Sequence, residues 1–399
     1  MKKHVGVILA DDLTGALDSG VKLVHSGYHV QVITSEGSLA ERDEEAEILV
    51  IDTETRHLEG KEAYEKVKKI TQEAWSLSVE WIYKKTDSAL RGNIGAELTA
   101  VMDASGEKKL LFVPAYPELG RTTLNGIQYV NGIRLSESVF AREVNDPSGN
   151  GEITSIIHAE TDTPVYLYEG EVKEGIGVYD AVSEEDLDRA YRAAGDFRLF
   201  AGCAGFLETF ASEKKQEENT VQTGSGLFVL CGSVNPVSAG QLSLAQEHGA
   251  LRHHLKASDL MSERTVLKEK AEQFLKDAEG YDVAILDTLA EGEIALPDEE
   301  NYVEVIRRIA EGMGYIGSVL LKESNDKTMM IIGGDTLNGL IRELKVKSLT
   351  PREELMPGLV LNTFETNGSV CCLISKSGGF GNRELITELE DILKKRCAK

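Results

Sequence analysis

The chain has 399 residues, enough for two or three domains at roughly 150 residues per domain. Its 43 Lys and Arg residues stand against 67 Asp and Glu residues, which gives a formal net charge of −24. Because such an acidic chain repels phosphate backbones and anionic lipid surfaces, we expect neither nucleic acid nor a membrane as a partner. No apolar stretch approaches the length of about 20 residues that a membrane span needs.

The N-terminal stretch MKKHVGVILADDL has an apolar run that meets two aspartates too early for a signal peptide. The five cysteines show no CxxC spacing, and we interpret them as free thiols in a reducing compartment. The histidine pair His253–His254 has no third ligand near it in the sequence, so we assign no metal ligands. These features predict a cytoplasmic protein.

Short runs of Val, Ile and Leu alternate with segments of helical periodicity through the first half of the chain. Helices are predicted from Leu13 to Gly27 and over 60–76. Strands are predicted over 5–10, 29–34, 48–52, 79–84, 110–114 and 164–167. The dipeptide Asn131-Gly132, between alternating residues, predicts a β-hairpin. Alternation of strands with helices is typical of a mostly parallel sheet covered on both faces.

The polar segment 212–226 has no large apolar residue except Val221, and a new alternation of strands and helices follows it. We therefore predict one domain over 1–215 and another over 226–399; the alternative is a surface loop within one domain. In the second half, strands are predicted over 227–231, 283–287, 329–332 and 370–375, and helices over 237–248, 302–313, 337–344 and 383–395. The predicted fold class is α/β, with two three-layer α/β/α domains, each around a mostly parallel sheet.

Three turns rich in small residues lie between predicted strands and helices of the second half. They are CGSVNP (231–236), IIGGDT (331–336) and SKSGGFG (375–381). Glycine lets a ligand approach the backbone closely, and helix N-termini present free N–H groups to anions. One such turn alone is more often a tight connection, but three, one with Lys376 and another with Asp335, favour a phosphate or nucleotide site. Neither a GxxxxGK[ST] motif nor a GxGxxG after the first strand is present.

Asp11 and Asp12 follow the first predicted strand, where a helix begins. One of them can cap the helix, which leaves the other for a hydroxyl group or a hydrated metal ion. An aspartyl phosphatase needs two aspartates spaced i, i+2, whereas these are adjacent, and strand alternation is expected to point them apart. Arg56, after the third strand, is interpreted with even odds as a surface residue or as a fork for a substrate carboxylate.

The segment YKKTDSALRGNIGAEL (83–98) has the highest density of reactive side chains. Its Lys85, Asp87, Ser88 and Arg91 fall between a strand and a helix, at the edge where α/β proteins bind ligands. The set suits a small polyhydroxy acid, since cations can bind its carboxylate while Asp and Ser bind its hydroxyls. The loop VPAYPELGRTT, after another strand, offers further polar side chains: Tyr116, Arg121 and Thr122.

Together these segments resemble the four-carbon acid sugar kinase family. The matching residues lie in family order along the chain: ADDLTGALDSG (10–20), KTDSALRGNIGAE (85–97), VPAYPELGRTT (113–123), CGSVNP (231–236), IIGGDT (331–336) and SKSGGFG (375–381). The resemblance implies an N-terminal sugar-acid-binding domain and a C-terminal nucleotide-binding domain. It also implies phosphorylation by ATP of the 4-hydroxyl of an acid such as D-threonate, D-erythronate or 3-oxo-tetronate.

The resemblance also implies roles for individual residues. The implied substrate contacts are Asp11, Asp12, Arg56, Lys85, Thr86, Asp87, Ser88 and Arg91. The implied ATP contacts are Ser233, Gly333, Gly334, Asp335, Thr336, Gly378 and Gly379. The loop Lys-x-Asp-Ser-x-Leu-Arg-Gly is similar to the threonate and erythronate branch, although Ala89 stands where we expect Thr.

We therefore expect a kinase of D-threonate or D-erythronate that uses ATP and Mg²⁺, with two domains that close over the substrates. Asp87 or Asp12 is expected to accept the proton of the 4-hydroxyl. The alternative substrate is 3-oxo-tetronate. Two alternatives from other classes are an aspartate-dependent phosphohydrolase, which releases phosphate without ATP, and a non-catalytic sensor, which binds both ligands without turnover. A homodimer is expected on general grounds alone.

Overall fold

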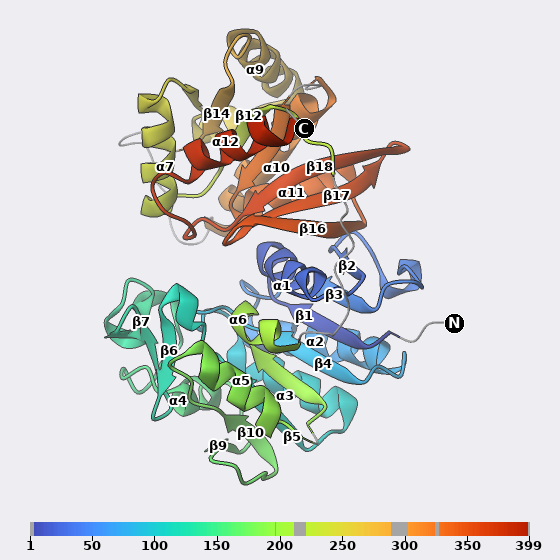
Figure 1. The fold of residues 1–399 in the computed structure, drawn as a ribbon, viewed down its shortest axis with the longest axis vertical. Coiled ribbons are helices and arrows are strands. Elements are labelled where there is room, and N and C mark those ends of the chain that lie inside the picture. Colours follow the sequence, from blue (N-terminus) through green and yellow to red (C-terminus); the bar gives the residue numbers. More distant parts are fainter. Residues whose placement is uncertain (1–3, 196, 211–220, 289–301, 324–326, 398–399) are drawn as a thin grey trace. The chain divides into compact units, whose positions relative to one another are not determined.

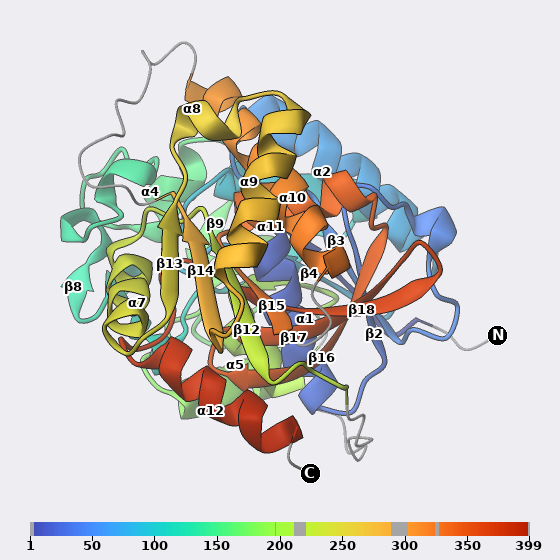
Figure 2. The ribbon, with the colours of Figure 1, turned by 90° about the horizontal axis from the view of Figure 1, so that it is seen from above.

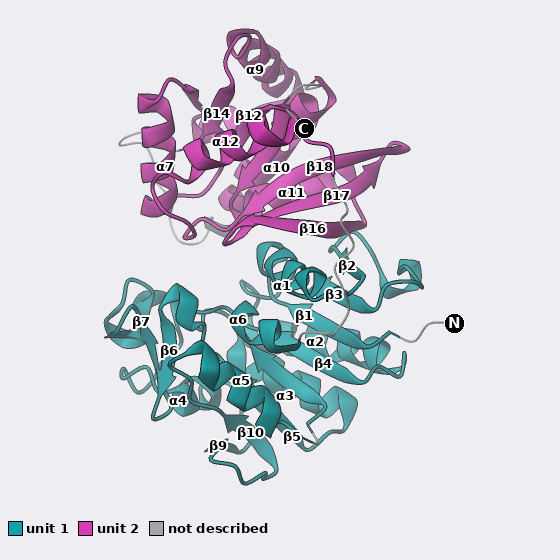
Figure 3. Ribbon diagram, viewed as in Figure 1, with its two compact units in different colours: residues 1–217 teal, residues 218–399 magenta. Residues whose placement is uncertain are grey.

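The computed structural model of the chain describes residues 4–195, 197–210, 221–288, 302–323 and 327–397. The chain divides into two compact units, residues 1–217 and 218–399 (Figures 1 and 3). The predicted boundary segment, 212–226, lies outside the described residues up to position 220. None of the described helices is long and apolar enough to cross a membrane.

The first unit is built on a parallel sheet in which every described pair of neighbouring strands runs in the same direction. The strand order is β2 (Val30–Ile33), β3 (Ile48–Asp52), β1 (Gly6–Ala10), β4 (Trp81–Lys85), β11 (Leu199–Gly202), β5 (Lys109–Val113), β10 (Gly175–Val178), β9 (Val165–Leu167). All residues of β1 and β3 are buried, as expected for strands covered on both faces.

Helices of the first unit form two contacting sets, one for each face of the sheet (Figure 1). One set contains α1 (Leu13–His25), α5 (Glu184–Ala193) and α6 (Ala204–Leu207), and the other contains α2 (Gly60–Trp75), α3 (Ile94–Ser105) and α4 (Ile153–His158). In a right-handed crossover, the direction in which the connection moves along the sheet decides which face its helix covers. The connections through α1 and α5 move in one direction, and those through α2, α3 and α4 move in the other. The two sets therefore cover opposite faces.

A small antiparallel sheet extends from the first unit. It consists of β6 (Arg121–Leu124), β7 (Ile127–Val130) and β8 (Ile133–Arg134). The hairpin predicted at Asn131-Gly132 is confirmed: Val130 pairs with Ile133, and the two turn residues have φ angles of 52° and 77°. This pair of positive φ angles is the conformation for which Asn-Gly is favoured in two-residue turns.

The second unit contains a mixed sheet. Its strand order is β13 (Leu251–His254), β14 (Val283–Asp287), β12 (Gly226–Cys231), β15 (Lys327–Ile332), β18 (Ser369–Lys376), β17 (Leu359–Thr366), β16 (Ser348–Met356). The strands from β13 to β18 pair in parallel, whereas β17 and β16 pair antiparallel. The two antiparallel strands were not predicted, but the prediction of mostly parallel sheets holds for both units.

Helices of the second unit also form two sets (Figure 2). One contains α7 (Pro236–Glu247) and α12 (Leu385–Cys397), and the other contains α8 (Ala257–Leu260), α9 (Arg264–Asp277), α10 (Tyr302–Glu323) and α11 (Gly334–Leu344). We predicted that α10 ends at Met313, before Gly314, but it continues to Glu323. The backbone of Gly339 in α11 lies so close to Gly314 that a Cβ there would collide with it. Gly314 therefore serves close helix packing and does not end the helix.

Candidate functional site

Asp11 and Asp12 occupy the turn from β1 to α1. Asp12 is the N-cap of α1, and its Oδ1 accepts a hydrogen bond from the Gly15 N–H at 3.1 Å. Arg56 follows β3, the neighbour of β1, and its guanidinium donates four hydrogen bonds of 2.8–2.9 Å to the two carboxylates. The expectation that adjacent aspartates point apart is wrong here, because β1 ends at Ala10 and one planar guanidinium spans both side chains.

Burial and neighbouring charges shift the pKa values of two carboxylates at this edge in opposite directions. Burial alone would raise the pKa of Asp11, but Arg56, Lys84 and Lys85 outweigh it and hold this pKa below its ordinary value. Asp52, at the end of β3, is buried, and burial, followed by the negative charges of Glu54 and Asp12, raises its pKa well above the ordinary value. Its Oδ2 has no hydrogen-bond partner in the described part of the chain. Asp52 was not chosen from the sequence, although it begins the segment that ends at Arg56.

The end of β4 supplies two buried lysines with different surroundings. Lys84 is fully buried and pairs with Glu97 of α3 at 2.7 Å. Lys85 is 5% exposed, and its Nζ donates to the Thr86 carbonyl oxygen at 2.9 Å. No ion pair of Lys85 occurs among the residues that the structure describes, and the buried hydroxyl of Thr86 has no partner there either. Lys85 and Thr86 therefore have donors left for a ligand.

Asp87 and Arg91 form the second ion pair of this site. The guanidinium of Arg91 donates to both carboxylate oxygens of Asp87, at 2.9 and 2.8 Å. The Arg56 Nη2 atom lies 3.8 Å from the same Asp87 carboxylate. Burial would raise the pKa of Asp87, but Arg91 and Arg56 hold it far below its ordinary value, so the carboxylate is ionised at neutral pH. Ser88 is in the same turn, where its carbonyl oxygen accepts a hydrogen bond from Gln128.

The carboxyl ends of β1, β3 and β4 thus bring together the residues predicted to bind substrate: Asp11, Asp12, Arg56, Lys85, Thr86, Asp87, Ser88 and Arg91. The pairing within this set was not predicted. Arg56 and Arg91 already hold carboxylates of the protein itself, so their binding of a substrate carboxylate stays a prediction. We call this set of eight residues the acid–base cluster.

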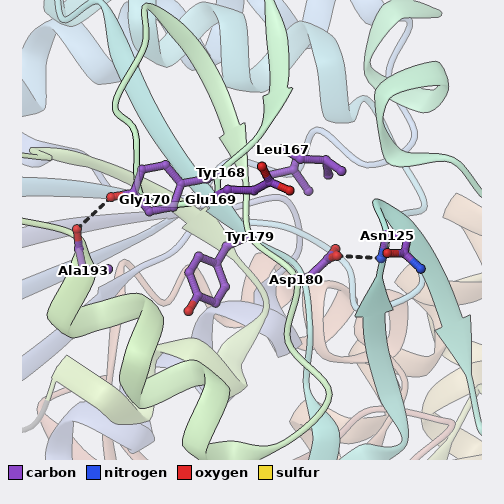
Figure 4. Close-up of a pocket in the computed structure, with 9 residues that line it drawn as sticks. Asn125, Leu167, Tyr168, Glu169, Gly170, Tyr179, Asp180 and Ala193 are labelled. Carbon is purple, nitrogen blue, oxygen red and sulfur yellow. Dashed lines mark hydrogen bonds between the residues drawn. The ribbon is translucent and has the colours of Figure 1, made fainter.

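A pocket of about 430 Å³ lies elsewhere in the first unit, at the carboxyl ends of β9 and β10 (Figure 4). Its lining combines two aromatic rings with two acidic side chains and contains no Lys or Arg: Asn125, Leu167, Tyr168, Glu169, Gly170, Val178, Tyr179, Asp180 and Ala193. Asp180 is held by the backbone N–H groups of Asn125 and Gly126, at 2.5 and 2.9 Å. This lining does not suit an anionic ligand, whereas the acid–base cluster contains three cations.

In the second unit, the three glycine turns follow β12, β15 and β18. These strands are neighbours and parallel, so their carboxyl ends lie at one edge of the sheet. Gly333, with φ of 111°, donates its N–H to the Lys376 carbonyl oxygen at 3.0 Å. The hydroxyl of Ser238 in α7 donates to the Gly378 carbonyl oxygen at 2.7 Å. The turns are therefore fixed to one another by hydrogen bonds.

Two glycines show how closely the turns approach. A Cβ on Gly232 would collide with the Thr336 hydroxyl, and a Cβ on Gly378 would collide with the Ser233 hydroxyl. The structure thus brings together the predicted nucleotide contacts from all three turns: Ser233, Gly333, Gly334, Asp335, Thr336, Gly378 and Gly379. Gly333, as the N-cap of α11, provides no side chain to accept from the first N–H groups of that helix. Those groups suit an anionic ligand.

Lys376 counted in favour of a phosphate or nucleotide site in the sequence, but it was not among the predicted ATP contacts. It is 1% exposed, and its Nζ donates to the carbonyl oxygens of Ser377 at 2.9 Å and Gly378 at 3.3 Å. No carboxylate pairs with it within the described ranges of the chain, and burial lowers its pKa to about 8. A buried cation with only carbonyl partners is typical of a site that an anion completes. Its position in SKSGGFG could have indicated this role.

Asp287, at the end of β14, binds two basic side chains, and this cluster was not predicted from the sequence. Its carboxylate pairs with Arg252 at 2.5 Å and with His254 at 2.6 Å. The neighbouring His253 packs its ring against Phe274 instead. Among the residues described, no group of three or more His, Cys, Asp or Glu side chains could hold a metal ion. The two histidines thus face different carboxylates, since His253 Nε2 lies 3.8 Å from Asp277 and His254 pairs with Asp287.

Comparisons with known proteins agree with this division of the chain. A sugar-binding N-terminal domain family matches residues 6–210, and a nucleotide-binding C-terminal domain family matches residues 228–386. The fold is shared with solved proteins of Salmonella typhimurium (TM-score 0.79, 20% identity, 99% of this chain and 98% of that chain) and Haemophilus influenzae (TM-score 0.72, 21% identity, 98% and 100%).

Several curated relatives match over almost their full length. The D-threonate kinase of Salmonella typhimurium is 27% identical, over 94% of this chain and 95% of the relative. The D-erythronate kinase of Heliobacterium modesticaldum is 26% identical, over 97% and 96%. The 3-oxo-tetronate kinase of Pseudomonas fluorescens is 25% identical, over 95% and 95%. With both domain families matched in this order, the chain belongs to the four-carbon acid sugar kinase family.

Proposed function

We propose that the protein transfers the terminal phosphoryl group of ATP to the 4-hydroxyl of a four-carbon sugar acid, most readily D-threonate or D-erythronate. The observation that carries this proposal is the pair of unlike sites. The first unit concentrates charged and hydroxyl side chains in the acid–base cluster, whereas the second presents glycine turns, a helix N-terminus and the buried Lys376. The first suits a hydroxy acid, and the second suits a polyphosphate.

The acid–base cluster supports a role for Asp87 in positioning the acceptor hydroxyl. Its pKa lies far below the ordinary value, so it is ionised but is a weak base. Phosphoryl transfer through a loose transition state requires alignment of the hydroxyl more than its early deprotonation. A fixed, ionised carboxylate provides that alignment and can take the proton as the new bond forms. Asp12 is the second candidate, although its oxygens already accept from Thr14, Gly15 and Arg56.

The nucleotide side of the proposal places the phosphates of ATP at the three glycine turns. The N–H groups at the start of α11 and the ammonium of Lys376 are the donors for them. Asp335, exposed in the first turn of α11, fits a Mg²⁺ ion, which proteins usually bind through one or two carboxylates together with substrate phosphates. When bound, the ion supplies neutralising charge on the terminal phosphates.

The choice of acid rests on the relatives and on the loop of residues 85–92. Relatives named as D-threonate, D-erythronate and 3-oxo-tetronate kinases match at 25–27% identity, so similarity alone does not separate these substrates. The KTDSALRG sequence favours the threonate and erythronate branch, and 3-oxo-tetronate is the second candidate. We also propose a homodimer, which light scattering of the purified protein would test.

The alternative of an aspartate-dependent phosphohydrolase fits the geometry less well. A nucleophilic aspartate needs a free oxygen directed at phosphorus, whereas Arg56 donates two hydrogen bonds to each of Asp11 and Asp12. Their negative charge is also compensated, which reduces nucleophilicity. A non-catalytic sensor would not need the ionised Asp87 beside the hydroxyl-binding groups.

The test is ATP-dependent ADP release, with Mg²⁺, across D-threonate, D-erythronate, their L forms and the 3-oxo analogues. We expect strong turnover on one acid, with a phosphorus NMR signal that couples to the protons on C4. If ATP binds but no acid is phosphorylated, the kinase proposal fails. If phosphate is released from 4-phosphorylated acids without ATP, the phosphohydrolase is correct.

A further inference from the structure

Arg121 is a cation of the first unit that the proposed mechanism has not used. It is the first residue of β6, and its backbone pairs with that of Tyr116 through two hydrogen bonds of 2.7 and 3.0 Å. Tyr116 comes shortly after β5, at the same edge of the parallel sheet as the acid–base cluster. The position of Arg121 is thus fixed by main-chain bonds, independently of any ligand.

The guanidinium of Arg121 is incompletely satisfied. Its Nη1 donates to the Leu119 carbonyl oxygen, but its Nε is buried and has no acceptor in the described part of the structure. No carboxylate pairs with Arg121 there either, and burial lowers its pKa. A buried N–H without an acceptor destabilises a protein, so such a group usually marks a missing partner.

Arg121 nevertheless lies beside the acid–base cluster. Electrostatic interactions with Asp87 and Arg91 act on its guanidinium. The Phe140 ring has the guanidinium carbon of Arg91 at 5.3 Å from its centroid and that of Arg121 at 5.9 Å. The two arginines therefore share one aromatic neighbour, but among the residues described Arg91 binds the carboxylates of Asp87 and Glu143, whereas Arg121 binds none.

The charges of the cluster show what Arg121 adds. Three carboxylates, those of Asp11, Asp12 and Asp87, stand beside three cations: Arg56, Lys85 and Arg91. A fourth carboxylate, that of the exposed Glu143, pairs with Arg91 at 3.2 Å, and Arg121 is a fourth cation. The charges therefore balance in number, but within the described residues none of these carboxylates pairs with Arg121. What Arg121 lacks is thus an acceptor in direct contact, which a substrate carboxylate would supply.

We propose that Arg121 binds the carboxylate of the sugar acid, with its free Nε–H as a donor. In this assignment, which rests on the proposed function, Arg56 and Arg91 hold aspartates, and Lys85 is the other cation with donors left for the acid. Arg121 then selects acids over uncharged polyols of the same length. A guanidinium suits this task because it presents N–H groups in the plane of a carboxylate.

The test uses the full-length protein and direct binding, so that it does not depend on turnover. Isothermal titration of D-threonate, D-erythronate and their carboxamides would compare the wild type with Arg121→Ala, Arg121→Lys and Arg134→Ala. Arg134 is an exposed arginine of the same small sheet and serves as the matched control. Ethylguanidinium would be added to Arg121→Ala to restore the missing group.

We expect wild type and Arg134→Ala to bind one acid about 10- to 100-fold more tightly than its carboxamide, as a charge-assisted bond implies. Arg121→Ala should bind the acid more weakly by that factor and bind the carboxamide as the wild type does. Ethylguanidinium should restore part of the lost affinity for the acid. Full preference for the acid in Arg121→Ala, or no binding of any acid by wild type, would overturn the inference. Should Arg121→Ala not fold, Arg121→Lys decides: it should keep its fold and its secondary structure but lose most of the preference.

The same experiment separates this inference from the kinase proposal. Acid binding that depends on Arg121, without ADP release, would remove the kinase and keep the carboxylate site. ADP release with wild-type affinity for the acid in Arg121→Ala would keep the kinase and remove Arg121 from the site.

Discussion

The two units use different means to prepare a site for an anion. In the acid–base cluster of the first unit, long side chains from several strands neutralise one another, as with Arg56 on its two aspartates. In the second unit, turns of glycine and small residues present backbone N–H groups beside Lys376, with which no carboxylate of the described residues pairs. The first arrangement can distinguish the hydroxyls and stereochemistry of a small acid. The second is proposed to recognise phosphate by charge and close backbone approach.

The largest expected effect concerns Asp87. Asp87→Asn removes the ionised carboxylate that aligns the acceptor hydroxyl, so we expect turnover to fall by about 10³-fold or more. ATP affinity should remain near that of the wild type, because the glycine turns belong to the other unit. Steady-state ADP release and nucleotide titration measure the two quantities.

Asp188→Asn is the matched control for that variant, since Asp188 is an exposed residue of α5. It should leave both quantities unchanged. An Asp87→Asn protein that is folded and fully active would remove Asp87 from the mechanism and leave Asp12 as the candidate for the proton acceptor.

The next effect concerns the stability of the first unit. Arg56→Ala leaves Asp11 and Asp12 adjacent and partly buried without their shared cation, so we expect a loss of about 3–5 kcal/mol in the free energy of unfolding. Urea unfolding followed by circular dichroism measures this. Arg192→Ala, at an exposed position of α5, is the control and should change stability by less than about 0.5 kcal/mol.

The same variant should alter the response to acid. The pKa of folded Asp11 is lower than in the unfolded chain, so its contribution is present above about pH 4 and is lost as the pH falls toward the folded-state pKa. Arg56→Ala should therefore show a smaller loss of stability between pH 5 and pH 3, where these pH limits are approximate choices around the ordinary Asp value. Equal acid sensitivity of the two proteins would contradict this ion-pair assignment.

A smaller effect is expected for Lys376. Lys376→Met should weaken ATP and ADP binding about 10- to 100-fold and leave adenosine binding unchanged, because the proposal assigns the ammonium to phosphate and not to the nucleoside. Its pKa of about 8 is below the unfolded-state value, so the free lysine loses its proton as the pH rises through 8. Wild-type affinity for ADP should therefore fall above about pH 8, while Lys376→Met should show no such fall.

Lys327→Met provides the matched control for that variant, since Lys327 begins β15, the neighbour of the strand that ends in Lys376, at the opposite end of the sheet. It should leave ADP affinity and its pH dependence as in the wild type. If Lys376→Met weakens adenosine as much as ADP, the lysine is structural and does not bind phosphate.

The smallest effect concerns glycine at the turns. Gly378→Ala places a Cβ against the Ser233 hydroxyl, which requires the turn to shift and should reduce ADP affinity about 3- to 10-fold, an effect of about 1 kcal/mol. Gly240→Ala, in the middle of α7, meets open space and should keep ADP affinity while raising stability by about 0.5–1 kcal/mol. Titration and thermal unfolding of both variants measure this contrast.

Much of the fold could be predicted because local patterns agree with it. The strands over 48–52 and 283–287 were predicted with their observed bounds, since apolar runs end there in a single acidic residue. The extent of α10 could not be predicted, because Gly314 serves contact with a helix that is distant in sequence. The antiparallel strands β16 and β17 were missed because they depend on pairing beyond the local sequence, β16 with β17 and β17 with β18.

Prediction of the candidate site from the sequence is also limited to what local patterns show. Motif position predicted that Asp87 and Arg91 lie at a ligand-binding edge, but not that they bind each other. Pairing depends on which side chains meet across strands, as with Arg56 and the two aspartates 45 and 44 positions away. The unused donors of Lys85 and Arg121 are visible only after these pairs are assigned. Sequence identifies the charged residues, and structure decides which of them remain for a ligand.

The central claim is that the acid binds the acid–base cluster and the nucleotide binds the glycine turns. Titrating D-threonate, D-erythronate and ADP separately into wild type, Asp87→Asn and Lys376→Met tests it most directly. We predict that Lys376→Met loses affinity for ADP alone, while Asp87→Asn changes affinity for the acid alone. Loss of acid binding in Lys376→Met, or of ADP binding in folded Asp87→Asn, would contradict the assignment of one ligand to each unit.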